Sequence, residues 1–274
     1  MKAALAIQPM EQFLIHAVVP LKLNLGGTVV DLSITNSTIM MFVAALTVCL
    51  ILGLSSRGAV VPGRMQAAGE MLFDLVDGIL VGPIIGEKGR PYLPFVFSIF
   101  MLILAMNILG VVLAFGNLGG ARWTFTPTTQ LAVTATLAVM TFLSVIVIGF
   151  VKNGANMYKL FVPSGMPWPM LLLVVPIELI SFLIRPLTLA MRLFGNMLGG
   201  HVVMYIFSSF VVMLGLIGAA GGLATLGYLG SGLSLAMVIA LTGLEFVVAG
   251  LQAFVFAALA TVYLSEVVNL GHGH

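Results

Sequence analysis

The sequence predicts an all-α polytopic membrane protein with about five transmembrane helices, of which the last two are long and strongly tilted, and one amphipathic helix at the membrane surface. Of the 274 residues, 61% are hydrophobic and only 7% are charged, whereas about a quarter of a soluble domain is charged. The apolar residues gather in runs of the length that crosses a bilayer. The last two runs are too long for one upright crossing.

The first half of the chain is predicted to hold three spans. Residues 1–36 are mixed in polarity, so we expect an extramembrane segment there and a helical membrane domain over residues 37–274. Apolar runs predict spans over Ile39–Leu54, Leu93–Phe115 and Leu131–Val151. Small polar side chains just before the first span can cap its helix; they are Thr35, Asn36 and Ser37.

The segment Arg64–Val81 has a different pattern. Its acidic residues Glu70, Asp74 and Asp77 share one helical face by three- and four-residue steps, with apolar residues between them. We expect an amphipathic helix on the membrane surface or among partner helices. A loop is predicted over Gly82–Pro91.

The segment Met170–Ala220 holds about 50 residues without a charged loop, although an upright span needs about 20. It either turns at Gly199–Gly200 or forms one strongly tilted helix, and the sequence leaves both open. A glycine-rich linker is expected over Gly221–Gly232, before a second overlong segment at Leu233–Leu270. We expect a tilted helical hairpin over about 170–270 to form an ion path.

Basic residues predict the orientation in the membrane, because cytoplasmic loops carry an excess of lysine and arginine. With one crossing per span and the N-terminus outside, six basic residues face the cytoplasm and three face outward. The inner set is Arg57, Arg64, Lys88, Arg90, Lys152 and Lys159, and the outer set is Lys2, Lys22 and Arg122. The C-terminus is then cytoplasmic.

Ionisable side chains inside the apolar segment Pro169–Phe210 are the main functional signal, since a charge at membrane depth is costly and usually functional. Steps of three and four residues place a polar stripe on one helical face, formed by Glu178, Ser181, Arg185, Thr188, Arg192, Asn196 and Gly199. His201 lies nine residues after Arg192 and points to the opposite side. Two faces with titratable groups can serve two separate aqueous pockets.

Several function classes are excluded by what the sequence lacks. There is no phosphate-binding loop, nucleophile elbow or Cys/His metal cluster, so we expect no cofactor, no metal and no catalytic apparatus. The net charge of +2 is too small for a nucleic-acid surface. The lone Cys49 excludes an internal disulfide, and His272 and His274 are interpreted as a polar end. Residues 1–14 lack the apolar core of a cleavable signal peptide.

Some interpretations stay open at this stage. A secondary transporter could use the polar stripe as a charged substrate site, although the paired repeats and broken helices common in transporters are not visible. Single residues also have structural interpretations. His201 could only orient Glu245, Glu178 could only pair with Arg185, and Asn107 could only join two helices by a hydrogen bond.

Two motifs carry a resemblance to a known family. The run Arg192-Leu193-Phe194-Gly195-Asn196-Met197, with Gly199, Gly200 and His201 after it, is similar to a signature of subunit a of the F-type ATP synthase. The run Leu251-Gln252-Ala253-Phe254-Val255-Phe256, with Tyr263 and Leu264 beyond it, resembles the last helix of that subunit. The resemblance extends from about Ser37 to the C-terminus.

The resemblance implies a non-catalytic stator subunit that forms two proton half-channels against a rotating c ring. The family's essential arginine matches Arg192, facing a ring carboxylate. Polar residues of the proton path match Glu178, Asn196, His201, Glu245 and Gln252; additional candidates are Arg185, Ser181 and Asn107. The implied partners are the c ring, b-type peripheral stalk subunits, the lipid bilayer and protons, in a bacterial plasma membrane.

Overall fold

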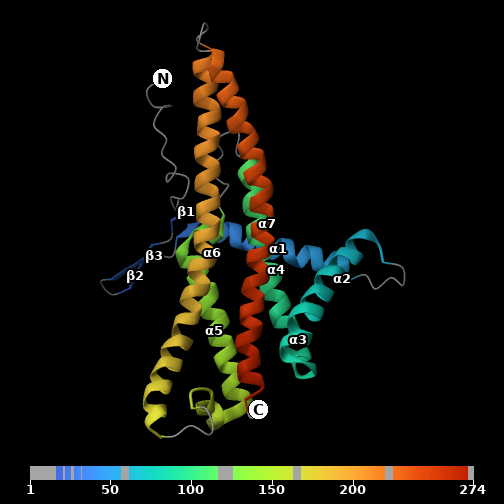
Figure 1. The fold of residues 1–274 in the computed structure, drawn as a ribbon, viewed down its shortest axis with the longest axis vertical. Coiled ribbons are helices and arrows are strands. Elements are labelled where there is room, and N and C mark those ends of the chain that lie inside the picture. Colours follow the sequence, from blue (N-terminus) through green and yellow to red (C-terminus); the bar gives the residue numbers. More distant parts are fainter. Residues whose placement is uncertain are drawn as a thin grey trace. The chain divides into compact units, whose positions relative to one another are not determined.

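The computed structural model describes residues 17–20, 22–25, 28–31, 33–56, 62–116, 126–162, 168–219 and 225–270. Within them, five helical segments are long and apolar enough to cross a membrane, which confirms the predicted fold class (Figure 1). The long helices are α1 (Asn36–Ser55), α4 (Leu93–Gly116), α5 (Leu131–Asn153), α6 (Trp168–Gly218) and α7 (Leu226–Val268).

Large apolar side chains cover the outside of these helices. Leu172 on α6 is 80% exposed, Val151 on α5 is 83% exposed and Phe42 on α1 is 72% exposed. Apolar patches of this extent are rare on soluble proteins and mark surfaces that meet other apolar material. Together with the helix lengths, they indicate faces that contact lipid.

The described part of the N-terminal segment contains short strands. Strand β1 (Ala17–Val19) pairs antiparallel with β4 (Ile34–Thr35), and β2 (Lys22–Leu25) pairs antiparallel with β3 (Thr28–Asp31). Helix α1 begins directly after Thr35, whose Oγ1 accepts a hydrogen bond from the backbone N–H of Thr38 at 3.4 Å. The capping role predicted for Thr35 is therefore confirmed.

The amphipathic segment is helical throughout, in several short pieces. Helix α2 (Arg64–Leu75) continues into the π-helical turn η3 (Val76–Val81) and then into α3 (Gly82–Ile85). The predicted loop over Gly82–Pro91 is therefore largely wrong. Pro83 near the start of α3 has a fixed φ that suits a first helical turn. Only Gly86, at φ +80°, breaks the winding, before the 3₁₀ helix η4 (Glu87–Tyr92).

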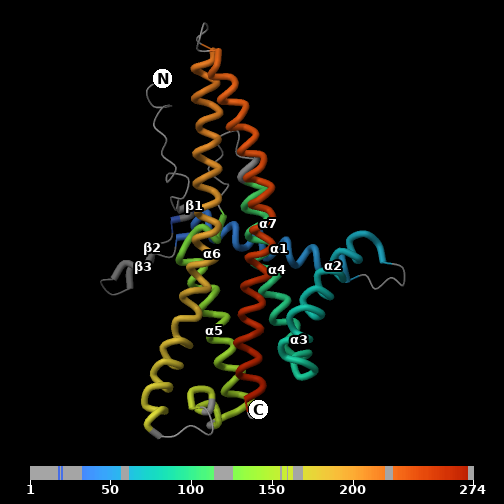
Figure 2. The backbone as a smooth tube through the Cα atoms, in the orientation of Figure 1, coloured from blue at the N-terminus to red at the C-terminus, as the bar shows by residue number. Residues whose placement is uncertain are grey.

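Helix α6 is a single continuous helix of 51 residues. It passes Pro176 and Pro186, and also Gly199 and Gly200, without a break in the winding (Figure 2). This decides between the two interpretations that the sequence left open, in favour of one helix. Its length of about 75 Å, from a rise of about 1.5 Å per residue, is more than twice the thickness of a bilayer core.

Helix α7 has 43 residues and begins earlier than predicted, so the expected linker up to Gly232 is wrong over its second half. The reason is close packing. A Cβ atom on Gly227 would lie 2.6 Å from the backbone oxygen of Leu214 on α6, and one on Gly230 would lie 2.9 Å from the Leu214 side chain. This glycine-rich stretch has low helix propensity, and its close contacts with α6 therefore stabilise it as a helix.

The contacts divide the chain into two compact units that cut across its long helices. Unit 1 contains residues 1–43, 106–130 and 194–251, and unit 2 contains residues 44–105, 131–193 and 252–274. The core of unit 1 includes the buried side chains of Met106, Val111, Met197 and Ala249. The core of unit 2 includes those of Leu80, Val96, Val145, Phe256 and Leu264. The short 3₁₀ helices η6 (Pro127–Thr129) and η7 (Gly154–Leu160) complete the described elements.

Gly149 allows α5 to approach α7 closely in unit 2. A Cβ atom there would lie 2.5 Å from Val267 Cγ1 and 2.8 Å from Met157 Cε. We therefore expect Gly149→Ala to lower the free energy of unfolding by about 1–3 kcal/mol, the usual cost of overpacking a core. The measurement is the fraction of detergent-solubilised chain that stays dispersed after heating. Gly53→Ala is the control, since nothing lies within 4 Å of its added Cβ; equal behaviour of the two variants would contradict the packing.

Candidate functional site

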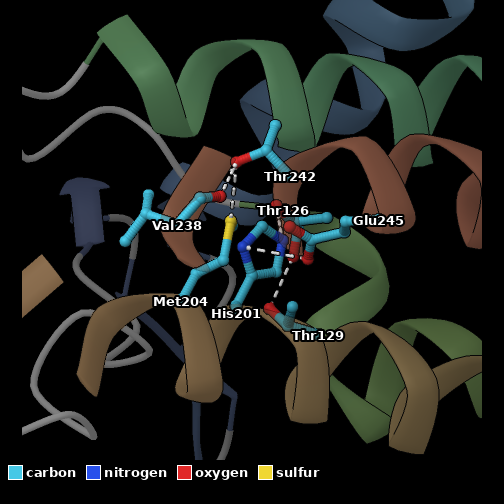
Figure 3. A network of polar contacts seen from close by, with 7 residues as sticks. All are labelled: Thr126, Thr129, His201, Met204, Val238, Thr242 and Glu245. Carbon is cyan, nitrogen blue, oxygen red and sulfur yellow. Dashed lines mark hydrogen bonds and ion pairs between the residues drawn. The ribbon is translucent and has the colours of Figure 1, made fainter. Parts of the chain in front are cut away.

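A buried acid and a buried histidine face one another in unit 1. His201 on α6 is 7% exposed and Glu245 on α7 is 5% exposed. The Nδ1 atom of His201 lies 3.6 Å from Oε1 of Glu245, and Figure 3 shows the two side chains pointing toward one another. Both carboxylate oxygens of Glu245 are buried without a hydrogen-bond partner among the described residues. His201 is therefore the principal polar neighbour of this carboxyl group.

Glycine creates the space that the carboxyl group of Glu245 occupies. A Cβ atom on Gly200 would lie 2.7 Å from Glu245 Oε1 and 3.3 Å from its carboxyl carbon. Gly199 and Gly195 differ, because nothing lies within 4 Å of a Cβ added to either. Gly200 therefore packs against the Glu245 side chain of α7, whereas Gly195 and Gly199 lie on an open face of α6.

Further polar groups surround the pair. Thr126, just before η6, places its Oγ1 3.0 Å from Nε2 of His201. Thr242, one turn before Glu245, donates to the carbonyl of Val238 at 2.8 Å, and its Oγ1 also lies 3.5 Å from Met204 Sδ (Figure 3).

Asn107 on α4 is fully buried, and its Nδ2 donates to the carbonyl of Ala249 on α7 at 3.2 Å. This contact makes it a hydrogen-bond link between helices, one of the two interpretations left open above. Its Oδ1 is buried without a hydrogen-bond partner among the described residues. A contribution of Asn107 to an ion path stays a prediction.

Arg185 is the centre of a second polar cluster, in unit 2. Its Nη1 donates to Oε2 of Glu266 on α7 in a close ion pair, and its Nη2 lies 3.7 Å from Oε1 of Glu178. The guanidinium also stacks on aromatic rings, 4.9 Å from the centroid of Tyr263 and 5.4 Å from that of Phe182. Two carboxylates and two rings therefore compensate one cation. The pairing of Glu178 with Arg185 is present, and Glu266 is the nearer acid.

Arg192 has a very different environment. Its side chain is exposed, and it makes no salt bridge with any carboxylate in the described part of the chain. Asn196, one turn later, is also exposed, as are Gly195 and Gly199. A polar, small-residue face of α6 is therefore open around an uncompensated cation.

Gln252 on α7 is 3% exposed, and Ser181 is exposed earlier on α6.

Sequence reasoning did not select three residues that the structure adds: Glu266, Tyr263 and Thr126. Glu266 could have been found, because Glu245, Gln252 and Glu266 are separated by seven and fourteen residues and thus share a face of α7. Tyr263 belongs to the second motif, but the motif alone assigns it no role. Thr126 carried no signal, since its neighbour His201 is 75 residues away.

No group of three or more His, Cys, Asp or Glu side chains among the described residues could hold a metal ion. The terminal residues His272 and His274 lie outside the described residues.

The imidazole of His201 and the carboxyl group of Glu245 can pass a proton between them. A guanidinium cannot do so, because it remains protonated.

Comparison with known proteins identifies the family. The family described as ATP synthase A chain matches residues 38–265. Among curated relatives named "ATP synthase subunit a", the one from Allorhizobium ampelinum is 45% identical over 268 residues, covering 97% of this chain and 98% of the relative. That of Nitrobacter winogradskyi is 42% identical, covering 97% and 100%, and that of Mesorhizobium japonicum is 43% identical, covering 98% and 100%. By extent and identity, the chain belongs to the ATP synthase A chain family.

Proposed function

We propose that the chain is the stator subunit a of an F-type ATP synthase, forming two offset proton half-channels against a rotating c ring and coupling proton flow to rotation. The proposal rests on the family and on one observation, the exposed Arg192 without a carboxylate partner in the described chain. A secondary transporter is not favoured, since the curated relatives quoted above are named as ATP synthase subunits.

The role of Arg192 follows from the cost of charge at membrane depth. An isolated cation on an apolar helix is expensive, so its counter-charge is expected from another chain. A ring carboxyl group facing lipid must be neutral. Opposite Arg192 it can release its proton, because a nearby cation favours the ionised form. Because a guanidinium does not give up its own proton, it also separates the two half-channels.

The two polar clusters supply the two half-channels. We assign His201 and Glu245 of unit 1 to the entry half-channel and Glu178, beside Arg185, to the exit half-channel. Asn196 and Gln252 are assigned to the path near Arg192, and Gly195 and Gly199 to the face that the ring approaches. The open surroundings of both glycines support this last assignment, since nothing lies within 4 Å of an added Cβ.

The proposal places the chain inside an assembly. Its partners are the c ring and b-type peripheral stalk subunits, its ion is the proton, and we assign it no reaction of its own. We place it in a bacterial plasma membrane with the N-terminus outside and the C-terminus in the cytoplasm. Moving one charge through 100 mV yields about 2.3 kcal/mol. The synthesis of one ATP therefore needs several protons. A ring that loads them one by one against a fixed cation meets this requirement.

Replacing Arg192 is the direct test. We expect Arg192→Ala to abolish ATP-driven proton uptake by inverted membrane vesicles and coupled ATP synthesis, while the assembled complex still purifies with its c ring. Arg64→Ala removes an exposed arginine at the start of α2 and serves as the control, with activity unchanged. Coupled synthesis by the Arg192→Ala complex would refute the proposal.

Gly200 tests the geometry of the entry half-channel. Its added Cβ would displace the carboxyl group of Glu245 from His201. Small misplacements of reacting groups are costly, so we expect Gly200→Ala to reduce ATP-driven proton uptake roughly tenfold or more. Gly232→Ala on α7, with nothing within 4 Å of its Cβ, should leave the rate unchanged. Equal rates in the two variants would show that the position of Glu245 is not critical.

The Arg185–Glu266 ion pair can be tested by a double-mutant cycle. Arg185→Gln and Glu266→Gln each leave a partly buried charge without its main partner, which destabilises more than removing both. We expect a coupling energy of about 0.5–3 kcal/mol between the two sites. The readout is the temperature at which the solubilised complex releases this chain. Purely additive shifts would mean that the pair contributes nothing to holding α6 against α7.

A further inference from the structure

The hydroxyl group of Thr126 contacts the side of the His201 ring that Glu245 does not use. Thr126 Oγ1 lies 3.0 Å from Nε2, while Nδ1 faces Glu245 Oε1 at 3.6 Å (Figure 3). Thr126 is 6% exposed and His201 is 7% exposed, so the contact is buried. Each ring nitrogen therefore has its own polar neighbour, and the proposed function assigns a role to only one of them.

Thr126 is held in position by its surroundings. A Cβ atom on Gly110 of α4 would lie 2.3 Å from both Oγ1 and Cγ2 of Thr126, so the side chain fills a notch that requires glycine. The backbone oxygen of Thr126 accepts hydrogen bonds from Thr129, from its N–H at 3.1 Å and from its Oγ1 at 2.7 Å. The backbone of Thr126 is therefore held by η6 and its side chain by packing against α4, independently of the histidine that it contacts.

A hydroxyl at Nε2 occupies that ring nitrogen, as acceptor of Nε2–H or as donor to its lone pair, and so leaves Nδ1 as the nitrogen that faces Glu245. In the imidazolium both nitrogens carry protons, and the Thr126 oxygen accepts the hydrogen bond from Nε2–H. When Nδ1 gives its proton to the Glu245 carboxylate, the neutral ring keeps the proton on Nε2, and the same hydrogen bond persists. The Nδ1 lone pair then faces the carboxylic acid O–H. One proton moves from nitrogen to oxygen, and the Thr126 contact is unchanged.

We propose that Thr126 is a positioning residue that holds His201 in the Nε2–H tautomer, so that Nδ1 is the atom that exchanges protons with Glu245. The inference rests on the proposed function for its consequence in transport, but the tautomer itself is a property of the chain. Hydrogen bonding at one ring nitrogen commonly determines the chemistry of the other. Among the described residues, no other hydroxyl lies within hydrogen-bond distance of His201.

The test compares Thr126→Val, which keeps the shape and removes the hydroxyl, with Thr126→Ser, which keeps the hydroxyl. Thr141→Val on α5 is the matched control, because its buried hydroxyl donates to the carbonyl of Leu137 on its own helix. The first readout is ¹⁵N solid-state NMR of histidine-labelled complex in membranes. The His201 signals are assigned by their loss in His201→Gln, since the chain has 4 histidines. The second readout is ATP-driven proton uptake as a function of pH.

We expect the Nε2–H tautomer in the wild type, in Thr126→Ser and in Thr141→Val, and a mixture of tautomers in Thr126→Val. Loss of one hydrogen bond predicts a roughly three- to tenfold lower uptake rate for Thr126→Val and a displaced pH profile, while Thr126→Ser keeps at least about half of the rate. A wild-type tautomer and rate in Thr126→Val would overturn the inference, and so would a mixture with an unchanged rate. A Thr126→Ser variant as slow as Thr126→Val would also overturn it.

Failure of the proposed function has a separate signature. A wild-type complex without ATP-driven proton uptake would reject the transport role and leave the tautomer measurement intact. Variants that do not assemble are recognised by the loss of this chain from the purified complex, and in that case Thr126→Cys, which keeps a small polar group in the notch beside Gly110, replaces Thr126→Val. A weakly bonding thiol is expected to give an intermediate tautomer ratio, and a ratio equal to that of the wild type would overturn the inference.

Discussion

The structure depends on how ionisable groups are compensated inside two long apolar helices. A charge at membrane depth is costly unless an opposite charge, a hydrogen bond or an aromatic ring accompanies it. Arg185 has two carboxylates and two rings, and His201 faces Glu245. Arg192 makes no salt bridge with a carboxylate in the described part of the chain. This contrast supports the proposal that the counter-charge of Arg192 comes from another chain.

The antiparallel packing of α6 and α7 explains why each unit holds one polar cluster. In unit 1, successive contacts join Val211 to Ser231, Met204 to Thr242 and His201 to Glu245, so that residue numbers fall on one helix as they rise on the other. In unit 2, Arg185 meets Glu266 and Tyr263 in the same sense. On α7, Glu245, Gln252 and Glu266 are separated by multiples of seven residues and so lie near one helical face.

Much of this arrangement could be predicted from the sequence, and the remainder depended on contacts between distant segments. Apolar runs located the spans, and the stripe located the ionisable residues of α6. The continuity of α6 was ambiguous because Gly199–Gly200 has the composition of a turn, yet Gly200 serves to admit the Glu245 carboxyl group. The start of α7 was misplaced because Gly227 and Gly230 have low helix propensity, which close packing against Leu214 overrides.

The polar stripe alone could not separate Arg185 from Arg192. The two residues are seven apart, so both lie on the same helical face with a drift of only about 20°. Their difference comes from α7, where Glu266 and Tyr263 reach Arg185 and no described carboxylate reaches Arg192. Whether a charge on α6 is compensated depends on which α7 residues lie opposite it. The residue pattern of α6 alone does not show this. An arginine that is compensated within the chain can hold two helices together. An arginine without a carboxylate partner in the chain remains available to another chain. This difference is the physical basis for proposing different roles for Arg185 and Arg192.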